Sequence, residues 1–280
     1  MKIAIIGVGD MGFPMAKNLH AAGYTVAGYD LSAQRRDALT AAGIWAGERV
    51  DEAIAGYDLV ITCLPSSEAF VTFAEKALLP LMRAGQVLVE AGTTILYEMR
   101  RVAALFAQKG IDVMDAPMSG GPMGVENKRL QMFIGGDRAL FDRLLPVFEA
   151  IGGPDMVYYC GASGMGQVAK GVNQLYLGLI PAACTEILAY ALRENLDPAL
   201  IHTMFDVKFP SLKPTLAQIE QGGHPGVKFR ELPYYIRHAE HAGYALPITT
   251  AIYRFMEDGE RVAFDDHRQA PSYAHELMKE

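Results

Sequence analysis

The 280-residue sequence predicts an α/β fold: a doubly wound parallel β-sheet over residues 1–162, followed by an all-helical domain over residues 163–280. Three observations predict this fold. Short apolar runs alternate with helix-like blocks through the first half, a glycine-rich turn follows the first run, and strand-like patterns nearly vanish after residue 162. Strands separated by helical crossovers form parallel sheets. Their uninterrupted apolar character fits burial on both faces of such a sheet.

The strands of the first domain are predicted from short apolar segments that end in glycine, aspartate or proline. They are KIAIIG (2–7), YTVAGYD (24–30), DLVITCLP (58–65), QVLVEAG (86–92) and IDVMDAP (111–117), with LQMFIGG (130–136) and MVYYCG (156–161) at the far edge. Helices are predicted between them at 10–23, 69–82 and 95–110. In the first of these helices, Met11, Met15 and Leu19 share one face, as helical periodicity requires.

The second domain is predicted to be helical throughout. Its helices are expected at 165–195, 198–205, 215–222, 234–243, 248–259 and 273–279. The stretch from Met156 to Thr185 carries one charged residue, Lys170, and is the one candidate for a membrane span. Because Asn173, Gln174 and Pro181 interrupt it and it follows a long soluble pattern, we expect a buried helix and no membrane partner.

Charge and cysteine content exclude several classes of function. The net charge of −7 and the pI of about 5.5 argue against nucleic acid or an anionic membrane as a partner, since both attract basic faces. The three cysteines lack metal-type spacing and fit a reducing compartment, and the seven histidines form no cluster, so no metal site is predicted. The N-terminal apolar run, Ile3–Val8, is too short for a signal peptide, which favours a cytoplasmic protein.

Gly7, Gly9 and Gly12 form the pattern G-x-G-x-x-G directly after a predicted strand and at the start of a predicted helix. Such glycines permit a tight turn, close approach of a pyrophosphate and close packing of the helix on the strand. Asp30 ends the second strand, where a carboxylate can accept hydrogen bonds from ribose hydroxyls. The pattern predicts a Rossmann-type dinucleotide-binding domain.

The choice of cofactor is predicted from the same region. Asp30 would repel a 2′-phosphate, and no arginine follows it immediately, although Arg35 and Arg36 lie further on. NAD is therefore favoured over NADP. Two alternatives remain: the glycines form only a turn, or they bind S-adenosylmethionine. The second is disfavoured because the first strand lacks the acidic residue that usually precedes the loop of methyltransferases.

Four further stretches resemble the β-hydroxyacid dehydrogenase family, which includes 3-hydroxyisobutyrate dehydrogenase and tartronate semialdehyde reductase. GVGDMGFPMAKNL (7–19) is similar to the family's phosphate loop, DAPMSGG (115–121) to its D-A-P-V-S-G-G, and GMGQVAKGVNQ (164–174) to its G-x-G-x-x-x-K-x-x-N-N. RELPYYIRHAEHAGYALP (230–247) resembles its K-D-L segment, and EAGTTIL (90–96) is a weaker match. The matches occur in the family's order from residue 3 to about residue 250.

The resemblance implies a substrate site. In the family the SGG loop binds a substrate carboxylate, which assigns Ser119, Gly120 and Gly121 here, and successive amides in a glycine turn do suit an anion. A simple turn that closes a sheet edge is the alternative. The family's lysine is the general acid and base, which assigns Lys170. A lysine among apolar groups holds its proton less tightly, since desolvation penalises the ammonium, and this suits proton transfer. A lysine that merely reaches the surface from a helix end is the alternative.

The resemblance also implies supporting residues. Asn173 and Gln174 would assist Lys170, and Arg230 would lie near the substrate. The expected contacts to the dinucleotide lie in several loops: Gly7, Gly9, Asp10, Met11, Gly12, Asp30, Leu64, Pro65 and Thr93. Gln174 as a plain packing residue remains an alternative.

The chain departs from the family's pattern at several positions. Gln174 replaces an asparagine, Arg230 and Glu231 replace a Lys-Asp pair, and Leu96 replaces a proline. Further differences lie in and after the SGG loop, at Pro122, Met123 and Lys128, where relatives carry smaller residues or glycine. These differences suggest an unusual substrate or a divergent branch.

The sequence therefore predicts an NAD-dependent oxidoreductase that transfers hydride between the nicotinamide and a small hydroxy acid or semialdehyde acid. A homodimer or homotetramer is expected, because a long apolar helix suits subunit contacts. Two rivals stay open: an imine reductase of the same architecture, which would favour NADPH, and a non-catalytic nucleotide-binding interaction protein. The substrate itself is left open among hydroxyisobutyrate, tartronate semialdehyde, succinic semialdehyde, threonate, and sulfonated or β-hydroxy amino acid analogues.

Overall fold

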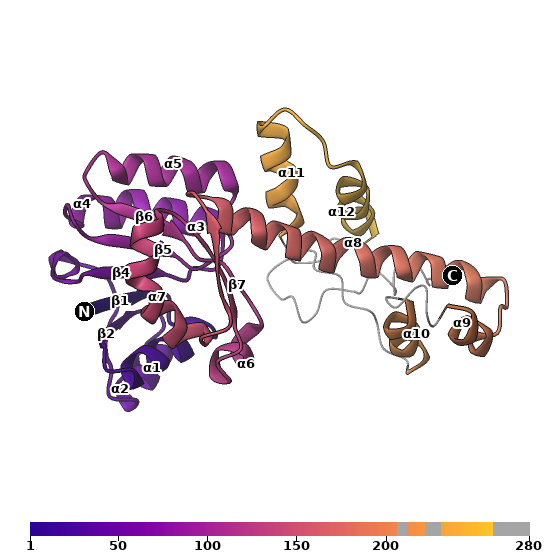
Figure 1. Ribbon diagram of the computed structural model, residues 1–280, viewed down its shortest axis with the longest axis horizontal. Coiled ribbons are helices and arrows are strands. Elements are labelled where there is room, and N and C mark those ends of the chain that lie inside the picture. Colours follow the sequence, from indigo (N-terminus) through magenta and orange to yellow (C-terminus); the bar gives the residue numbers. More distant parts are fainter. Residues whose placement is uncertain (206–211, 222–230, 260–280) are drawn as a thin grey trace. The chain divides into compact units, whose positions relative to one another are not determined.

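The computed structural model describes residues 1–205, 212–221 and 231–259 (Figure 1). The chain divides into two compact units, Met1–Lys170 and Gly171–Glu280. The boundary predicted at residue 162 precedes helix α8 (Met165–Arg193), whose first residues belong with the first unit. Arg230 and the helix predicted at 273–279 lie outside the described residues.

Nine strands form one sheet in the first unit, which is described throughout, and the α/β prediction is confirmed. Their spatial order is β3-β2-β1-β4-β5-β6-β8-β7, with β9 beside β8. The strands are β1 (Lys2–Ile6), β2 (Thr25–Tyr29), β3 (Trp45–Gly47), β4 (Leu59–Thr62), β5 (Val87–Glu90), β6 (Asp112–Asp115), β7 (Met118–Ser119), β8 (Gln131–Gly135) and β9 (Val157–Gly161).

The sheet is parallel from β3 to β6 and mixed at its far edge. There β8 runs antiparallel to β6 and β7, and β9 runs parallel to β8. The reversal is a difference from the purely parallel sheet that the sequence predicts. Its reason is the connection from β6 to β8, which holds only β7 and the short helix α6 (Gly121–Glu126), whereas a parallel return needs a longer crossover.

Helices cover both faces of the sheet (Figure 1). Besides α6 they are α1 (Gly12–Ala21), α2 (Ala33–Ala41), α3 (Ser67–Phe73), α4 (Leu79–Leu81), α5 (Leu96–Ala107) and α7 (Arg138–Gly152), with a 3₁₀ turn at Glu52–Gly56 and a π turn at Ala74–Leu78. Side-chain caps fix two of their starts, since Ser66 Oγ accepts from Ala69 N at 3.1 Å and Asp137 Oδ1 accepts from Leu140 N at 2.8 Å.

Successive side chains of a strand point to opposite faces of the sheet, so the core consists of two apolar clusters, one on each face. Ile3 and Ile5 of β1 belong to a cluster with side chains of α1 and α7, such as Leu19 and Phe148. Their neighbours Ala4 and Ile6 belong to a second cluster with side chains of α3 and α5, such as Phe70 and Phe106. Because both faces are packed, the strands need apolar residues at every position, which is the pattern that the sequence shows.

The second unit contains five helices among its described residues: α8 from Gly171 onward, α9 (Pro198–Phe205), α10 (Leu212–Glu220), α11 (Leu232–His241) and α12 (Pro247–Gly259). Two small apolar clusters hold them together. One joins α8 to α11 and α12 through Ala182, Leu232 and Ile252. The other joins α8 to α9 and α10 through Leu188, Ile201 and Leu216. Helix α8 is therefore the central element of this unit.

Helix α8 is less buried than the sequence predicts. Its length and composition would allow it to cross a membrane, but core helices of soluble proteins can be equally long and apolar. Only 29% of an apolar 18-residue stretch of this helix is buried within the chain. Five exposed apolar residues recur along it at intervals of four, four, seven and three: Val172, Tyr176, Ile180, Ile187 and Tyr190. The apolar character of α8 thus serves an exposed face as well as the core of the unit.

Candidate active site

The predicted cofactor residues lie at the carboxyl ends of adjacent parallel strands. Gly7 follows β1, Asp30 follows β2, Leu64 lies two residues beyond β4, and Thr93 lies three residues beyond β5. The chain moves outward in opposite directions from β1 and β4, so the strand order reverses between them. Doubly wound sheets bind ligands outside the carboxyl ends of the strands at such a point. The fold therefore brings these separate motifs to one edge.

Two glycines of the first loop have positions that no other residue fits. Gly7 has a φ of +88°, and a Cβ there would overlap the Cys63 carbonyl oxygen. A Cβ on Gly12 would overlap the Gly7 carbonyl oxygen, so only glycine allows α1 to start so close to β1. Leu64 packs beside Gly7, and its Cδ2 lies 3.3 Å from the point that a Cβ on Gly7 would occupy. This loop has the tight turn and the helix N-terminus that a dinucleotide pyrophosphate requires.

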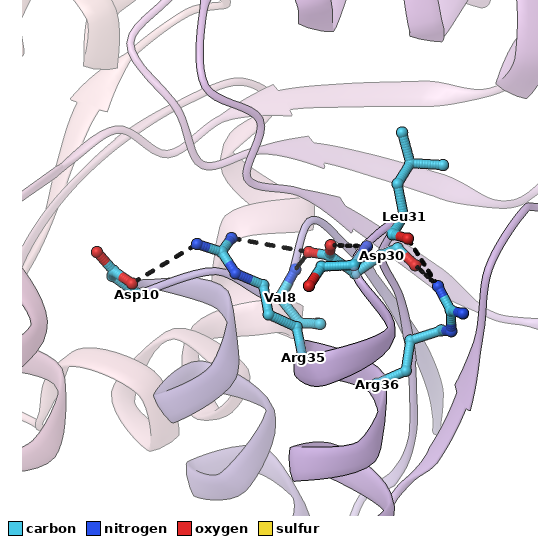
Figure 2. Close-up of polar contacts among 7 residues, drawn as sticks. Val8, Asp10, Asp30, Leu31, Arg35 and Arg36 are labelled. Atoms are coloured by element: carbon cyan, nitrogen blue, oxygen red, sulfur yellow. Dashed lines mark hydrogen bonds and ion pairs between the residues drawn. The ribbon is translucent and has the colours of Figure 1, made fainter. Parts of the chain in front are cut away.

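Asp30 is held by backbone amides at the end of β2 (Figure 2). Its Oδ2 accepts from Val8 N at 3.0 Å, and its Oδ1 accepts from Ser32 N at 2.9 Å. Each carboxylate oxygen can accept more than one hydrogen bond, so this arrangement still suits the ribose hydroxyls of a dinucleotide. Asp30 thus joins the second strand directly to the phosphate loop.

Two arginines of α2, Arg35 and Arg36, contact Asp30 (Figure 2). The Arg35 guanidinium lies between Asp30 Oδ2, at 3.9 Å, and Asp10 Oδ1, at 3.8 Å, and it occupies the space above Gly9. Arg36 donates to the main-chain carbonyls of Asp30 and Leu31, both at 2.9 Å. The first turn of α2 returns these side chains to the strand end. The two arginines therefore add positive charge beside the carboxylate from which the sequence predicts a preference for NAD.

The predicted general base is buried beside the predicted anion loop. Lys170 is 6% exposed, and its Nζ donates to the Met118 carbonyl oxygen at 2.6 Å. Met118 precedes Ser119, Gly120 and Gly121, and both glycines are exposed and adopt positive φ angles of +132° and +63°. A side chain would strain either position. The structure therefore brings Lys170 and the SGG turn together, although they are separated by some fifty residues.

Asp115 is a site residue whose role the sequence alone does not reveal. It is buried at the end of β6, and its Oδ1 accepts from Gly164 N at 2.7 Å while its Oδ2 accepts from Gln167 N at 2.8 Å. These are amides of the first turn of α8, which carries Lys170 one turn later. Burial raises the pKa of the Asp115 carboxyl, and hydrogen bonds from the backbone oppose that rise. The sequence feature that could have identified Asp115 is its position as the first residue of the DAPMSGG motif.

The remaining predicted residues are placed as follows. Leu64 and Thr93 are half-buried and Pro65 is exposed, while Met11 precedes α1 and Asp10 is exposed. Asn173 and Gln174 belong to the second unit, where Asn173 Nδ2 donates to Gln174 Oε1 at 3.3 Å and Gln174 is buried. In the same unit Tyr235, which the sequence did not single out, packs against Gly171 and has a buried hydroxyl without a hydrogen-bond partner among the described residues.

The departures from the family's pattern have local structural explanations. Lys128 has a φ of +51°, a conformation that favours the glycine of relatives. Leu96 is the first residue of α5, a position at which proline is also well suited. Pro122 lies in the first turn of α6, where its missing N–H leaves no intrahelical bond unmade. None of the three alters Lys170 or the SGG turn.

Comparisons with known proteins agree with this geometry. Residues 2–161 match the family model described as the NAD binding domain of 6-phosphogluconate dehydrogenase. An NAD-dependent L-serine dehydrogenase of Pseudomonas aeruginosa is 33% identical over 202 residues, which cover 71% of this chain and 67% of that protein. The chain belongs to the β-hydroxyacid dehydrogenase family. It is a nicotinamide-dependent oxidoreductase of the class that acts on hydroxy acids.

Solved structures extend the similarity to the whole chain. The Mycobacterium tuberculosis 3-hydroxyisobutyrate dehydrogenase with L-serine has a TM-score of 0.81 and 27% identity, and the match covers 99% of this chain and 97% of that one. An imine reductase of Streptomyces aurantiacus has a TM-score of 0.63 and 23% identity, over 100% of both chains. At that identity the second match shows a shared fold alone. The helical region after α8 therefore belongs to the family's architecture.

A second buried carboxyl lies next to the loop that carries Thr93. Glu90 accepts hydrogen bonds from the hydroxyls of Thr62 and Thr94 and from Gly92 N. Burial raises its pKa from 4.5 to about 8, and these hydrogen bonds offset only part of the rise. Asp115, the residue paired with Glu90 on β6, raises it further.

We expect Glu90 to make the stability of the protein depend on pH. Because its folded pKa is raised, the folded protein binds more protons than the unfolded chain between about pH 4.5 and 8, so stability falls as pH rises through that range. Urea unfolding across this range should show a free-energy difference, wild type minus Glu90→Gln, that declines with pH. The nearby Cys63 and Asp115 remain in both proteins. A difference that stays constant with pH would contradict the raised pKa.

Proposed function

We propose that this protein catalyses the reversible, NAD-linked oxidation of a small hydroxy acid to the corresponding semialdehyde acid, with Lys170 as general base and general acid. The observation that supports the proposal is the position of the Lys170 ammonium, 2.6 Å from the carbonyl of Met118, which leads into Ser119, Gly120 and Gly121. An anion on that turn would lie next to a buried amine. This is the arrangement needed for proton transfer between an amine and a hydroxyl oxygen that lies close to a bound carboxylate.

The protein's own groups divide the chemistry as follows. The exposed turn at Ser119–Gly121 binds the substrate carboxylate and fixes its orientation. Lys170 takes the hydroxyl proton in oxidation and returns it to the carbonyl oxygen in reduction. The bound nicotinamide accepts or supplies the hydride. Gly7, Gly12 and Asp30 fit such a cofactor. The two glycines allow a tight turn in which any Cβ would collide with a backbone carbonyl oxygen, and Asp30 directly follows β2 at the carboxyl ends of the strands.

The substrate we propose is a carboxylic acid with a primary alcohol on the carbon next to its α-carbon. L-serine and 3-hydroxyisobutyrate, which appear in the names of the relatives, share this part and differ in the α-substituent. The turn and the lysine need only the shared part, since one binds the carboxylate and the other the hydroxyl. Which residues distinguish the α-substituents stays a prediction from the sequence, which names Gln174 and Arg230.

The proposal is tested with Lys170→Ala. We expect kcat to fall by about 10²–10⁴, the contribution of a general acid–base group, while the Kd for NADH changes little. Turnover is followed by NADH absorbance with 3-hydroxyisobutyrate and L-serine, and Kd by calorimetry. Lys109→Ala is a matched control, because the Lys109 ammonium also donates to backbone carbonyls, those of Leu79 and Pro80, at a distant exposed position.

Three results would contradict the proposal or a part of it. If the wild-type protein reduces cyclic imines but no semialdehyde acid, it is an imine reductase. Wild-type protein that binds NADH and turns over neither class of substrate would make it a non-catalytic nucleotide-binding protein. Full activity of Lys170→Ala would remove the lysine from the chemistry without removing the family assignment.

We propose NAD as the preferred cofactor, and Asp30 and Arg35 as the two residues that set the preference. The Asp30 carboxylate repels a 2′-phosphate, and the Arg35 guanidinium 3.9 Å away reduces that repulsion. Asp30→Asn should lower the NADH-over-NADPH preference in Kd about tenfold, and Arg35→Ala should raise it. Arg49→Ala, at an exposed ion pair with Glu48, is the control. Equal preferences in all four proteins would overturn the assignment.

We also propose a homo-oligomer, a dimer or a tetramer, that uses the exposed apolar stripe of α8 formed by Val172, Tyr176, Ile180, Ile187 and Tyr190. These side chains are 37–72% exposed, and their spacing by threes and fours keeps them on one face. A second copy of the chain offers the same apolar stripe, so two copies can cover each other around a twofold axis.

Light scattering coupled to size exclusion tests the oligomer. Ile187→Glu places a charge in the stripe and should shift the mass toward the monomer, while Tyr244→Glu, at an exposed tyrosine after α11, should not. A monomeric wild type would contradict the proposal.

The absence of disulfides among Cys63, Cys160 and Cys184 suits a reducing compartment, and on that ground we propose that the protein is cytoplasmic, which cell fractionation tests.

A further inference from the structure

Gln167 lies one helical turn before Lys170 on α8 and is 3% exposed. Both ends of its carboxamide contact the same loop. Its Oε1 accepts from Thr94 N at 3.0 Å, and its Nε2 donates to the Gly92 carbonyl at 2.9 Å. The side chain therefore joins the lysine helix to the loop after β5 by two hydrogen bonds that reproduce the pairing of a neighbouring strand.

The loop that Gln167 contacts is also fixed from its other side. The Glu90 carboxyl accepts from Gly92 N and from the Thr94 hydroxyl, both at 3.1 Å. Glu90, Thr94 and Gln167 are all buried. Gly92 and Thr94 are thus held between a carboxyl of the sheet and a carboxamide of α8, and Thr93 between them is half-buried.

Gln167 is fixed in turn through its own main chain. Its backbone N–H donates to Asp115, which also accepts from Gly164 N. Gly166, next to it, approaches β8 so closely that a Cβ would overlap the Phe133 carbonyl oxygen. One turn of α8 therefore contacts the loop after β5, the end of β6 and the middle of β8, and Lys170 extends from the next turn to Met118.

We infer that Gln167 is a positioning residue that sets the distance between the Lys170 ammonium and the Gly92–Thr94 loop, and so aligns proton transfer with hydride transfer. The inference rests on the proposed function. Residues three apart on a helix share a face, so a shift of α8 at Gln167 moves Lys170 with it. The proton and the hydride leave adjacent atoms of one substrate, and reacting atoms must lie within about 3–3.5 Å, so a displacement of about 1 Å can cost about 100-fold in rate.

The chemistry of the side chain is specific to this role. A carboxamide is at once an acceptor for Thr94 N and a donor for the Gly92 carbonyl. Glutamate has the same length but lacks the donor, and it would place an acceptor against the Gly92 carbonyl. Leucine fills similar volume and makes neither bond, leaving a buried donor and a buried acceptor unpaired.

The experiment compares Gln167→Leu and Gln167→Glu with Gln86→Leu. Gln86 is a matched control: it is also 3% exposed, its carboxamide also bonds backbone groups, of Ile54, Tyr57 and Arg83, and it lies before β5, at the opposite end of that strand. The measurements are kcat and KM for the best hydroxy acid found with wild type, Kd for NADH, the primary deuterium isotope effect on kcat, and the free energy of unfolding.

We expect both Gln167 variants to lose about 10- to 100-fold in kcat, with Kd for NADH within about threefold of wild type and an isotope effect larger than that of wild type. Gln86→Leu should lose stability and keep kcat and the isotope effect. A Gln167 variant that matches the Gln86 control in kinetics, or one that loses NADH affinity in place of kcat, overturns the inference. Gln167→Glu decides the matter if Gln167→Leu does not fold. A wild type without hydroxy acid turnover would instead refute the proposed function.

Discussion

The hydrogen bonds from the first turn of α8 to Asp115 are the interaction on which the rest of the candidate active site depends. A helix start has amide N–H groups without intrahelical partners, and they must be satisfied when they are buried. Here two of these amides, of Gly164 and Gln167, are satisfied by one carboxyl of the sheet. This cap determines where α8 begins and in which direction its first turns point. The same helix start places Lys170, which is buried and donates to the Met118 carbonyl oxygen.

Buried carboxyls in this fold have a cost as well as a use. Desolvation opposes their ionisation, as the raised pKa values of Glu90 and Asp115 indicate. In return each accepts several hydrogen bonds from loops that lack regular partners. Buried polar networks are favourable only when their members are satisfied, and then they hold a single arrangement. The desolvation of Glu90 and Asp115 is thus accompanied by hydrogen bonds that hold the neighbouring loops in one arrangement.

The cofactor edge shows a related balance of charge. Asp30 is oriented by two backbone amides, whereas Arg35 contacts it only at ion-pair distance and is about half exposed. A residue fixed by backbone hydrogen bonds keeps its position when a ligand binds, and an exposed long side chain can move. The two residues differ in rigidity, so the cofactor preference that we propose rests on the fixed carboxylate more than on the adjustable guanidinium.

The sequence by itself determined the fold class, the presence of β1, β2, β4, β5 and β6, the phosphate loop and the family. Each of these is local: apolar runs buried on both faces, glycines where a Cβ would collide, and motifs that are continuous in the chain. It did not determine β3, β7 or the antiparallel β8, because strands of two or three residues carry no periodicity and strand direction depends on a nonlocal connection. It also could not show the contacts among Glu90, Asp115 and Gln167, or Arg35 beside Asp30. Those residues are distant in sequence or have ordinary neighbours, and only packing of the strand ends against α8 and α2 brings them together.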